Sequence, residues 1–192
     1  MSNSVDRMPA IPPEAMTAAQ RDAAAEISNG PRGGVVGPFA AALRSPECMR
    51  RLQLFGAYLR YDSHIPARLR EIAILLTAHR WRQDYEWLTH EPLARAAGVP
   101  EATIDAIRTG AVPPSLSGDE AVIFELCAVL FADGRVADAL YARAVEVLGE
   151  PGVIDLVCAV GYYGTLAMIM NVARTALPEG VSAPRWTTVA EQ

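Results

Sequence analysis

Apolar residues recur along this chain at the three- and four-residue spacing of an α-helix, whereas the two-residue alternation of a β-strand is scarce. Ala, Leu, Arg and Glu are abundant, and Gly and Pro fall between the periodic segments. The apolar stripe is clearest in two segments, where it runs through Met49, Leu52, Phe55, Gly56 and Leu59, and through Leu69, Ile72, Ala73 and Leu76. The pattern therefore predicts an all-α protein.

Residues that cap or end helices divide the periodic stretches. Asn29-Gly30-Pro31 is a typical helix end, and Ser117 with Glu120 three residues later has the spacing of a capping box. The predicted helices span residues 14–28, 46–61, 66–78, 82–97, 100–108, 117–131, 136–148 and 153–176. The pattern leaves open whether the chain bends between His79 and Arg82.

The length of 192 residues is that of one domain. We expect a flexible N-terminal arm at 1–13, a single domain at 14–177 and a C-terminal tail at 178–192. Shifting the sequence by 82 residues places Ile72 over Ile154 and continues with apolar matches, which suggests two related helical halves. Any two buried helices could match this well by chance, so the match alone does not establish a duplication.

The last predicted helix is unusually apolar, because no charged residue occurs between Asp155 and Arg174. A helix that spans a bilayer needs about 20 predominantly apolar residues. Small or polar residues such as Gly161, Thr165 and Asn171 interrupt this stretch. We therefore expect the helix to be buried within its own domain and against another subunit, and we expect no membrane contact.

The charge balance limits what the protein can bind. The 17 basic and 22 acidic residues give a net charge of −5, which provides no field that would attract nucleic acid. The chain has no lysine, so every basic residue is an arginine and Schiff-base chemistry is excluded. Any anionic substrate would have to be held by guanidinium groups, whose planar fork suits a carboxylate.

The three cysteines, Cys48, Cys127 and Cys158, are far apart in apolar helical sequence, and no Cys-x-x-Cys occurs. This usage indicates buried small side chains in a reducing compartment. Residues 1–13 are polar and proline-rich, without the basic and apolar regions of a signal peptide. We therefore expect a cytoplasmic protein.

Candidate catalytic side chains gather between positions 79 and 90. If this segment is one continuous helix, a rotation of about 100° per residue places four hydrogen-bonding side chains within about 60° of one another. The polar stripe then contains His79, Gln83, Glu86 and His90, with Trp87 on its border. Glu86 and His90 are one turn apart, close enough for the carboxylate to orient a general acid or base. The alternative is that the stripe simply faces water.

This pattern does not favour a metal site. On a continuous helix His79 lies about 16 Å from His90, so one ion cannot be bound by both. Glu86 and His90 remain, and they are fewer than the three or four ligands usual for zinc. We therefore expect neither a metal nor another cofactor.

The loop at residues 32–38, Arg-Gly-Gly-Val-Val-Gly-Pro, is rich enough in glycine to approach a ligand or a partner chain closely. A plain connector is the alternative interpretation. The sequence alone does not decide between the two.

Several blocks of sequence share the pattern of one family. The central blocks are Leu69-Arg70-Glu71-Ile72-Ala73-Ile74-Leu75, Tyr85-Glu86-Trp87-x-x-His90 and Pro92-Leu93-Ala94-Arg95-Ala96-Ala97-Gly98-Val99. With Gly30-Pro31-Arg32-Gly33-Gly34, Gly37-Pro38-Phe39, Gly161-Tyr162-Tyr163, Ala167-Met168 and Asn171, they resemble the carboxymuconolactone decarboxylase family, whose superfamily includes alkylhydroperoxidase D. The resemblance covers about Gly30 to Leu177.

The resemblance implies an all-α, alkylhydroperoxidase D-like fold of about eight or nine helices in paired hairpins, which works as a trimer, hexamer or dimer. In the peroxidase branch a glutamate, a Cys-x-x-Cys and a histidine form a proton relay. Glu71 and His90 match its outer members, whereas Gln83 and Glu86 stand where the cysteines would be. Because neither side chain can form a thiolate or a disulfide, thiol peroxidase activity is not expected.

The decarboxylase branch also lacks these cysteines and acts on a small carboxylated lactone. We therefore expect a cofactor-free lyase, isomerase or hydrolase that acts on a small carboxylated or lactone-like molecule with His90, Glu86 and Glu71 as acid–base residues. His90 is expected to transfer the proton, oriented by Glu86 or Glu71. Candidate substrate-binding residues are Gln83, His79, Trp87, Arg80, Arg82, Tyr162, Tyr163 and Asn171, and Arg70 is a further candidate for the anion contact. The alternative is a non-catalytic binding or scaffold protein. A closed apolar pocket around the glutamates and His90 would favour the enzyme, and a stripe open to water would favour the alternative.

Overall fold

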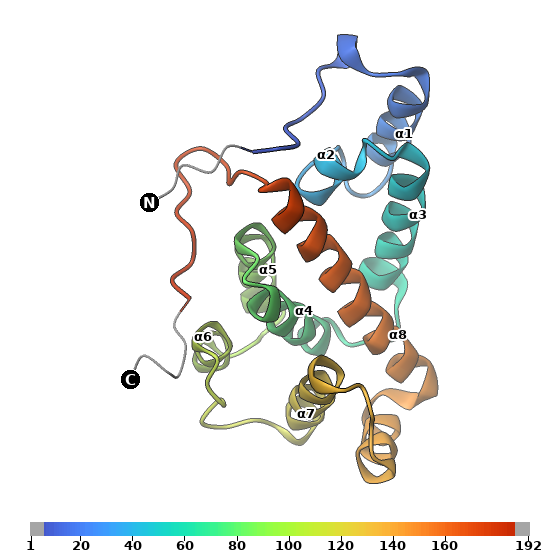
Figure 1. Ribbon diagram of the computed structural model, residues 1–192. Coiled ribbons are helices and arrows are strands. Elements are labelled where there is room, and N and C mark those ends of the chain that lie inside the picture. Colours follow the sequence, from blue (N-terminus) through green and yellow to red (C-terminus); the bar gives the residue numbers. More distant parts are fainter. Residues whose placement is uncertain (1–5, 187–192) are drawn as a thin grey trace.

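The computed structural model describes residues 6–186, and within this range the chain is helical and has no β-strand (Figure 1). Its α-helices are α1 (Ala18–Asn29), α2 (Pro38–Ala42), α3 (Pro46–Ala57), α4 (Ala67–Trp81), α5 (Asp84–Ala96), α6 (Glu101–Thr109), α7 (Gly118–Ala132) and α8 (Asp138–Ala173). Two short elements accompany them, the 3₁₀ turn η1 (Pro13–Ala15) and the π-helical turn η2 (Tyr58–Asp62). The all-α prediction is confirmed. The predicted arm and tail extend into residues 1–5 and 187–192, which lie outside the described residues.

Local capping fixes where several helices start. The Ser117 hydroxyl accepts a hydrogen bond from the Glu120 backbone N–H, and the Glu120 carboxylate accepts one from the Ser117 N–H, so the predicted capping box is present. Thr17 and Gln20 form a second capping box at α1, which the sequence interpretation did not include. The buried Glu120 carboxylate also binds Arg68, which ties α7 to the start of α4.

The protein is built around α4, which packs against α5, α6, α7 and α8 (Figure 1). The side chains at the centre of this arrangement are almost completely inaccessible to water, among them Ile72, Leu75, Trp87, Ile123, Leu126 and Leu156. A second, smaller core lies between α1, α2 and α3 and contains Ile27, Phe39, Leu43 and Met49. The functional residues described below lie where α4, α5 and α8 meet the end of α3 and the start of α2.

The last helix, α8, includes most of both segments that the sequence predicted as separate helices, 136–148 and 153–176. Gly149 interrupts its helical path with φ 67° and ψ 164°, a backbone conformation that suits glycine, so the predicted break is present as a kink. By length and composition alone α8 could cross a membrane, but 61% of the residues in its most apolar stretch are buried inside the fold. A core helix has the same properties.

The chain reverses direction between α4 and α5, so the assumption of one continuous helix from His79 to His90 is wrong. Helix α4 ends at Trp81, Arg82 adopts a left-handed conformation (φ 50°, ψ 44°), and Gln83 caps the start of α5. The reversal lets α5 pack back against α4. The helical-wheel angles predicted for His79, Gln83, Glu86 and His90 therefore do not apply.

The suggested duplication receives no support from burial. Ile72 on α4 is fully buried, whereas Ile154, its counterpart after the 82-residue shift, is 62% exposed on α8. Leu75 and Val157 differ in the same way. The relation between two halves stays a hypothesis.

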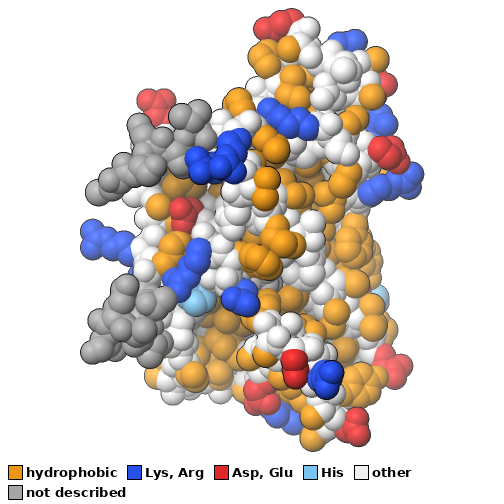
Figure 2. Space-filling model, in the orientation of Figure 1, with side chains coloured by type: hydrophobic (Ala, Val, Ile, Leu, Met, Phe, Trp, Pro, Cys, Tyr) orange, Lys and Arg blue, Asp and Glu red, His pale blue; other side chains and the backbone are white. Residues whose placement is uncertain are grey.

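Apolar side chains are exposed along α8 and beside it on α3 and η2, over a surface that we call the α3–α8 face (Figure 2). It consists of Leu54, Phe55, Tyr58, Ile154, Val157, Met168 and Val172. Two contacts join α3 and η2 to α8 at this face. The Phe55 ring packs edge to face against Tyr162, and the Tyr58 hydroxyl donates a hydrogen bond to Asp155. Large exposed apolar patches mark association surfaces.

We expect a second copy of the chain to cover the α3–α8 face, so light scattering should give a particle heavier than the 20.6 kDa chain. Replacing both Val157 and Met168 by Glu should shift the particle towards 20.6 kDa, since unpaired carboxylates are costly to bury in an apolar contact. The matched control is Val112→Glu, which adds a charge at an exposed position on the loop between α6 and α7. A wild-type monomer at micromolar concentration would contradict this expectation.

Candidate functional site

The centre of the candidate site is a hydrogen bond between α5 and α4. His90 Nδ1 lies 2.7 Å from Glu71 Oε2, and both side chains are only 5% exposed. A carboxylate can only accept hydrogen bonds, so Nδ1 carries the proton and donates it. In the neutral imidazole the lone pair then lies on Nε2, and His90 is one of the residues that line the adjacent cavity.

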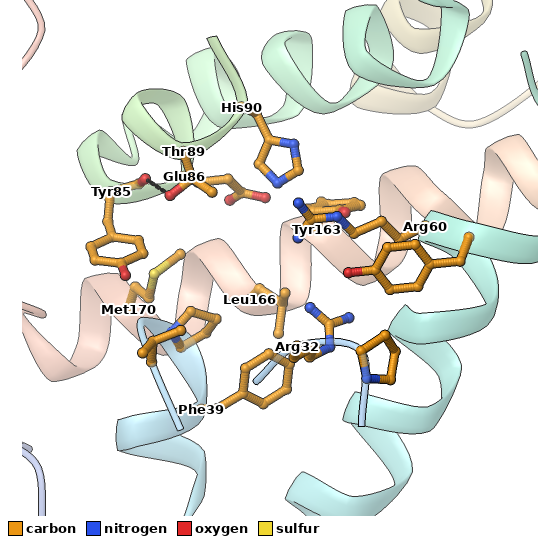
Figure 3. Close-up of a pocket in the computed structure, with 14 residues that line it drawn as sticks. Arg32, Phe39, Arg60, Tyr85, Glu86, Thr89, His90, Tyr163, Leu166 and Met170 are labelled. Atoms are coloured by element: carbon orange, nitrogen blue, oxygen red, sulfur yellow. Dashed lines mark hydrogen bonds between the residues drawn. The ribbon is translucent and has the colours of Figure 1, made fainter. Parts of the chain in front are cut away.

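The cavity beside His90 has a volume of about 230 Å³ and lies between α5, α8, η2 and the loop that leads into α2 (Figure 3). Its wall is formed by Pro31, Arg32, Val36, Pro38, Phe39, Arg60, Tyr61, Tyr85, Glu86, Thr89, His90, Tyr163, Leu166 and Met170. Most of these side chains are apolar or aromatic, with a few convergent polar groups. That combination is typical of a pocket for a small molecule.

Glu86 is the polar group in this wall with the least usual environment. It is 3% exposed, and neither carboxyl oxygen has a hydrogen-bond partner among the described residues. Its backbone is fixed because the Gln83 side chain accepts a hydrogen bond from the Glu86 N–H at 3.0 Å. Burial raises the pKa of Glu86 well above its ordinary value, so the carboxyl group is neutral over a range of pH in which an exposed glutamate is ionised.

Two arginines bring positive charge to the same cavity. The Arg32 guanidinium lies 4.8 Å from the centroid of the Phe39 ring and donates to the Tyr162 hydroxyl at 3.4 Å, while its buried Nε has no partner among the described residues. Arg60 projects from η2 into the cavity (Figure 3). Within the described part of the chain neither guanidinium forms an ion pair with a carboxylate.

Glycine at position 56 makes room for this arrangement. A Cβ atom on Gly56 would lie 2.0 Å from the Tyr162 hydroxyl oxygen and 2.5 Å from Arg32 Nη2, which is too close for either contact. At Gly37 a φ of 57° and the close approach of the Tyr85 ring exclude a larger residue in the same way. These two glycines let α3 and the start of α2 approach the cavity closely.

The aromatic side of the cavity comes from α8. Tyr163 meets the His90 ring edge to face, with centroids 5.0 Å apart, and Tyr162 packs against Tyr163. Burial raises the pKa of Tyr162 to about 12 and also raises that of Tyr163, so both hydroxyls stay protonated at neutral pH. The site therefore offers neutral hydroxyls beside its histidine.

The central part of the chain is similar to a known protein family. Residues 46–128 match the carboxymuconolactone decarboxylase family, in agreement with the predicted resemblance. This segment is a carboxymuconolactone decarboxylase domain. It contains Glu71, Glu86 and His90, whereas Arg32 and Tyr163 lie outside the matched range. No curated protein and no solved structure matches the chain.

The carboxymuconolactone decarboxylase domain and α8 together place only some of the predicted residues at the cavity. Glu86, His90 and Tyr163 line it, and Glu71 lies behind His90. Tyr162 does not line it but accepts a hydrogen bond from Arg32, which does. Gln83 caps α5, and its amide donates to Asn171 Oδ1 at 3.2 Å. Asn171 in turn donates to the Trp81 carbonyl, so these two amides join α5, α4 and α8 and do not face the cavity.

Five other predicted residues lie away from the cavity. His79 and Arg80 border a different hollow, next to Ile107 and Phe124. Trp87 is fully buried, and the Arg82 guanidinium lies 5.8 Å from the centroid of the Trp186 ring. Arg70, the further candidate for the anion contact, is a neighbour of Glu71, with Nε 3.8 Å from Oε1.

The sequence interpretation missed Arg32 and Arg60 as residues of the site. Arg32 had a signal, because the glycine-rich loop that it begins was considered able to approach a ligand, and this loop does line the cavity. Arg60 had none, since it falls at the end of the helix predicted at 46–61, and nothing in that helix singled out an arginine.

The cysteines have no place in the site. None of the three lines the cavity, and burial raises the pKa of the Cys127 thiol to about 12. Among residues 6–186, no three side chains of His, Cys, Asp or Glu lie close enough together to hold a metal ion.

The buried, unpartnered Glu86 makes stability depend on pH. Because its pKa in the folded chain is raised, the folded state binds more protons than the unfolded state above the ordinary pKa, and stability falls as pH rises towards the raised value. Each pH unit between the ordinary and the raised pKa lowers the free energy of unfolding by about 1.4 kcal/mol. Glu86→Gln should therefore be more stable than wild type at pH 7, and the difference should shrink towards pH 4.

Urea unfolding across this pH range measures the effect. The matched control is Glu146→Gln, at an exposed position on α8, which should follow the wild-type profile. Parallel pH profiles for wild type and Glu86→Gln would show that Glu86 is not buried without a partner.

Proposed function

We propose that this protein is an enzyme of lyase, isomerase or hydrolase type that moves a proton with His90 on a small carboxylated or lactone-like molecule and needs no cofactor. The observation that carries the proposal is the buried Glu71–His90 hydrogen bond beside a cavity with two arginines. Membership of the carboxymuconolactone decarboxylase family, found for residues 46–128, agrees with it.

The Glu71–His90 pair suits general acid–base catalysis. Glu71 holds the imidazole in one orientation and one tautomer, so Nε2 can accept a proton from a molecule in the cavity. When Nε2 takes that proton, the imidazolium is stabilised by the carboxylate 2.7 Å from Nδ1. The pair can then return the proton to another atom of the same substrate.

The arginines and the size of the cavity indicate the kind of substrate. Arg32 and Arg60 have no carboxylate partner among the described residues, and a guanidinium binds a carboxylate through two parallel hydrogen bonds. A volume of about 230 Å³ is small for a binding pocket, which limits the ligand to a small molecule.

Burial of the site favours an enzyme over the alternative of a non-catalytic binding or scaffold protein. Glu71, Glu86 and His90 are all nearly inaccessible to water, so they do not form a stripe that faces solvent. Glu86 and His90 line one cavity, and Glu71 lies behind His90. Water-excluded polar groups act more strongly on a developing charge than exposed ones do. We further propose a cytoplasmic location and no membrane or nucleic-acid partner.

Once a substrate is found, His90→Gln should lower kcat by about 10²- to 10⁴-fold, the usual contribution of a general acid–base group. The matched control is His79→Gln, because His79 borders a different hollow and should leave turnover unchanged. Screening lactones and oxo acids for turnover, together with mass spectrometry of co-purified ligands, would provide the assay. A His90→Gln protein with wild-type turnover would exclude the proposed role of His90.

The proposal also predicts that turnover does not depend on a thiol. Replacing Cys48, Cys127 and Cys158 by Ala should leave turnover intact, and the wild-type protein should not reduce hydroperoxides. Hydroperoxide reduction that disappears with one of these cysteines would contradict it.

A further inference from the structure

We propose that Glu86 is a second catalytic group, a neutral acid that donates a proton to the carbonyl oxygen of a substrate whose carboxylate is bound by Arg32 and Arg60. The substrate class is then a small oxo or lactone carboxylate with a proton-bearing carbon next to its carbonyl. This inference rests on the proposed role of His90 as the base. Glu86 and Glu71 were the two candidates for orienting His90, and Glu71 makes that hydrogen bond, which leaves Glu86 for a different role.

The position of Glu86 supports this role. Glu86 and His90 lie one turn apart on α5, so both side chains reach the same part of the cavity. Figure 3 shows the Glu86 carboxyl group next to the His90 ring, with the Arg32 guanidinium on the opposite side of the cavity. Both carboxyl oxygens of Glu86 are buried without a partner among the described residues, so a ligand is free to take its hydrogen bond.

The groups around the carboxyl leave it neutral. The titratable groups that share the cavity with it or lie close by are His90 and Tyr85 on α5, Tyr162 and Tyr163 on α8, Arg60 and Tyr61 on η2, and Arg32 on the loop before α2, with Glu71 behind His90. None of these groups hydrogen-bonds to Glu86. Its place in the first turn of α5 favours the anion slightly. The cost of burying an unpaired carboxylate is much larger, so desolvation decides and the neutral form is favoured.

A bound carboxylate ligand strengthens the same preference. Its negative charge on Arg32 and Arg60 neutralises the guanidinium groups and disfavours a second anion at Glu86. The arginines also stabilise the ligand carboxylate as an anion, which opposes its loss as carbon dioxide. The carboxylate therefore serves to position the substrate, and the reaction takes place at the other end of the molecule.

The step that this arrangement can carry out is an enolisation. His90 Nε2 takes the proton from the carbon next to the carbonyl, and the C–H electron pair becomes the carbon–carbon double bond. The carbonyl π electrons move to oxygen, which takes the proton of Glu86. The products are the enol, the imidazolium of His90 and the Glu86 carboxylate. In a substrate whose enol is conjugated with a further carbon–carbon double bond, His90 can return the proton to the far carbon of that system while Glu86 takes back the enol proton, which completes an isomerisation without any co-reactant.

The test uses 4-oxopentanoate, a small oxo acid, as the probe with the full-length protein in D₂O. Wild type should bind it and speed deuterium incorporation beside the carbonyl, measured by NMR. Glu86→Gln and His90→Gln should each slow this exchange by about 10²- to 10⁴-fold without a large change in Kd. Arg32→Met should instead raise Kd by about tenfold or more. The matched control is Arg80→Met, because Arg80 borders another hollow.

A second measurement does not depend on turnover. Infrared spectra at neutral pH should contain a protonated-carboxyl band that Glu86→Gln removes and Glu146→Gln retains. Wild-type exchange kinetics in Glu86→Gln, with exchange lost in His90→Gln, would overturn this inference and leave the proposed function standing. Exchange retained in His90→Gln would overturn the proposed function itself. Failure of wild type to bind the probe, or to exchange it once bound, would exclude this substrate class.

Discussion

The hydrogen bond between His90 and Glu71 is the interaction on which the rest of the site depends. Its two members are buried and come from helices that run on either side of a sharp chain reversal. A buried carboxylate and a buried imidazole are each costly alone, and the hydrogen bond between them offsets part of that cost. It also settles which imidazole nitrogen is available to a ligand. The reversal at Arg82 is therefore a condition for the chemistry as well as for the packing.

Charge is distributed unevenly around the cavity. The α5 side carries a neutral acid and a histidine, whereas the loop before α2 and the turn η2 contribute guanidinium groups without carboxylate partners among the described residues. Small residues allow this distribution, because Gly56 leaves the space that Tyr162 and Arg32 occupy. The substrate that we propose, with a carboxylate at one end and a carbonyl at the other, would place one end on each side. Its binding would supply hydrogen-bond partners for groups that otherwise have none.

The sequence predicted the helices well, since their periodicity and caps are local properties. The capping box at Ser117 and the break at Gly149 are both present. The reversal between α4 and α5 could not be predicted, because Arg82 takes a left-handed conformation that usually marks glycine or asparagine, and Gln83 is an unusual cap. Without that reversal the polar stripe was placed on one helix, and His79 was grouped with His90.

Contacts between helices that are distant in sequence determine which other residues lie at the cavity. Glu71, Glu86 and His90 were predicted from spacing and family resemblance, but the partner of His90 is on another helix, and spacing alone favoured Glu86. Arg32 and Arg60 reach the cavity from segments far from α5 in sequence. The glycine-rich loop was the one local signal for Arg32, and nothing in the local pattern sets Arg60 apart from a surface arginine. Trp87 was predicted at the border of the polar stripe as a substrate-binding residue. Contacts between helices bury it completely in the core instead.

The central claim is that Glu71 fixes His90 with its proton on Nδ1 and its lone pair on Nε2. Nitrogen-15 NMR of the histidine side chains in the full-length protein tests this claim most directly, with His90→Gln used to assign the signals. At a pH where His90 is neutral, the account predicts a protonated Nδ1 and an unprotonated Nε2, and loss of this preference in Glu71→Gln. A proton on Nε2 in the wild-type protein, or a tautomer unaffected by Glu71→Gln, would contradict it.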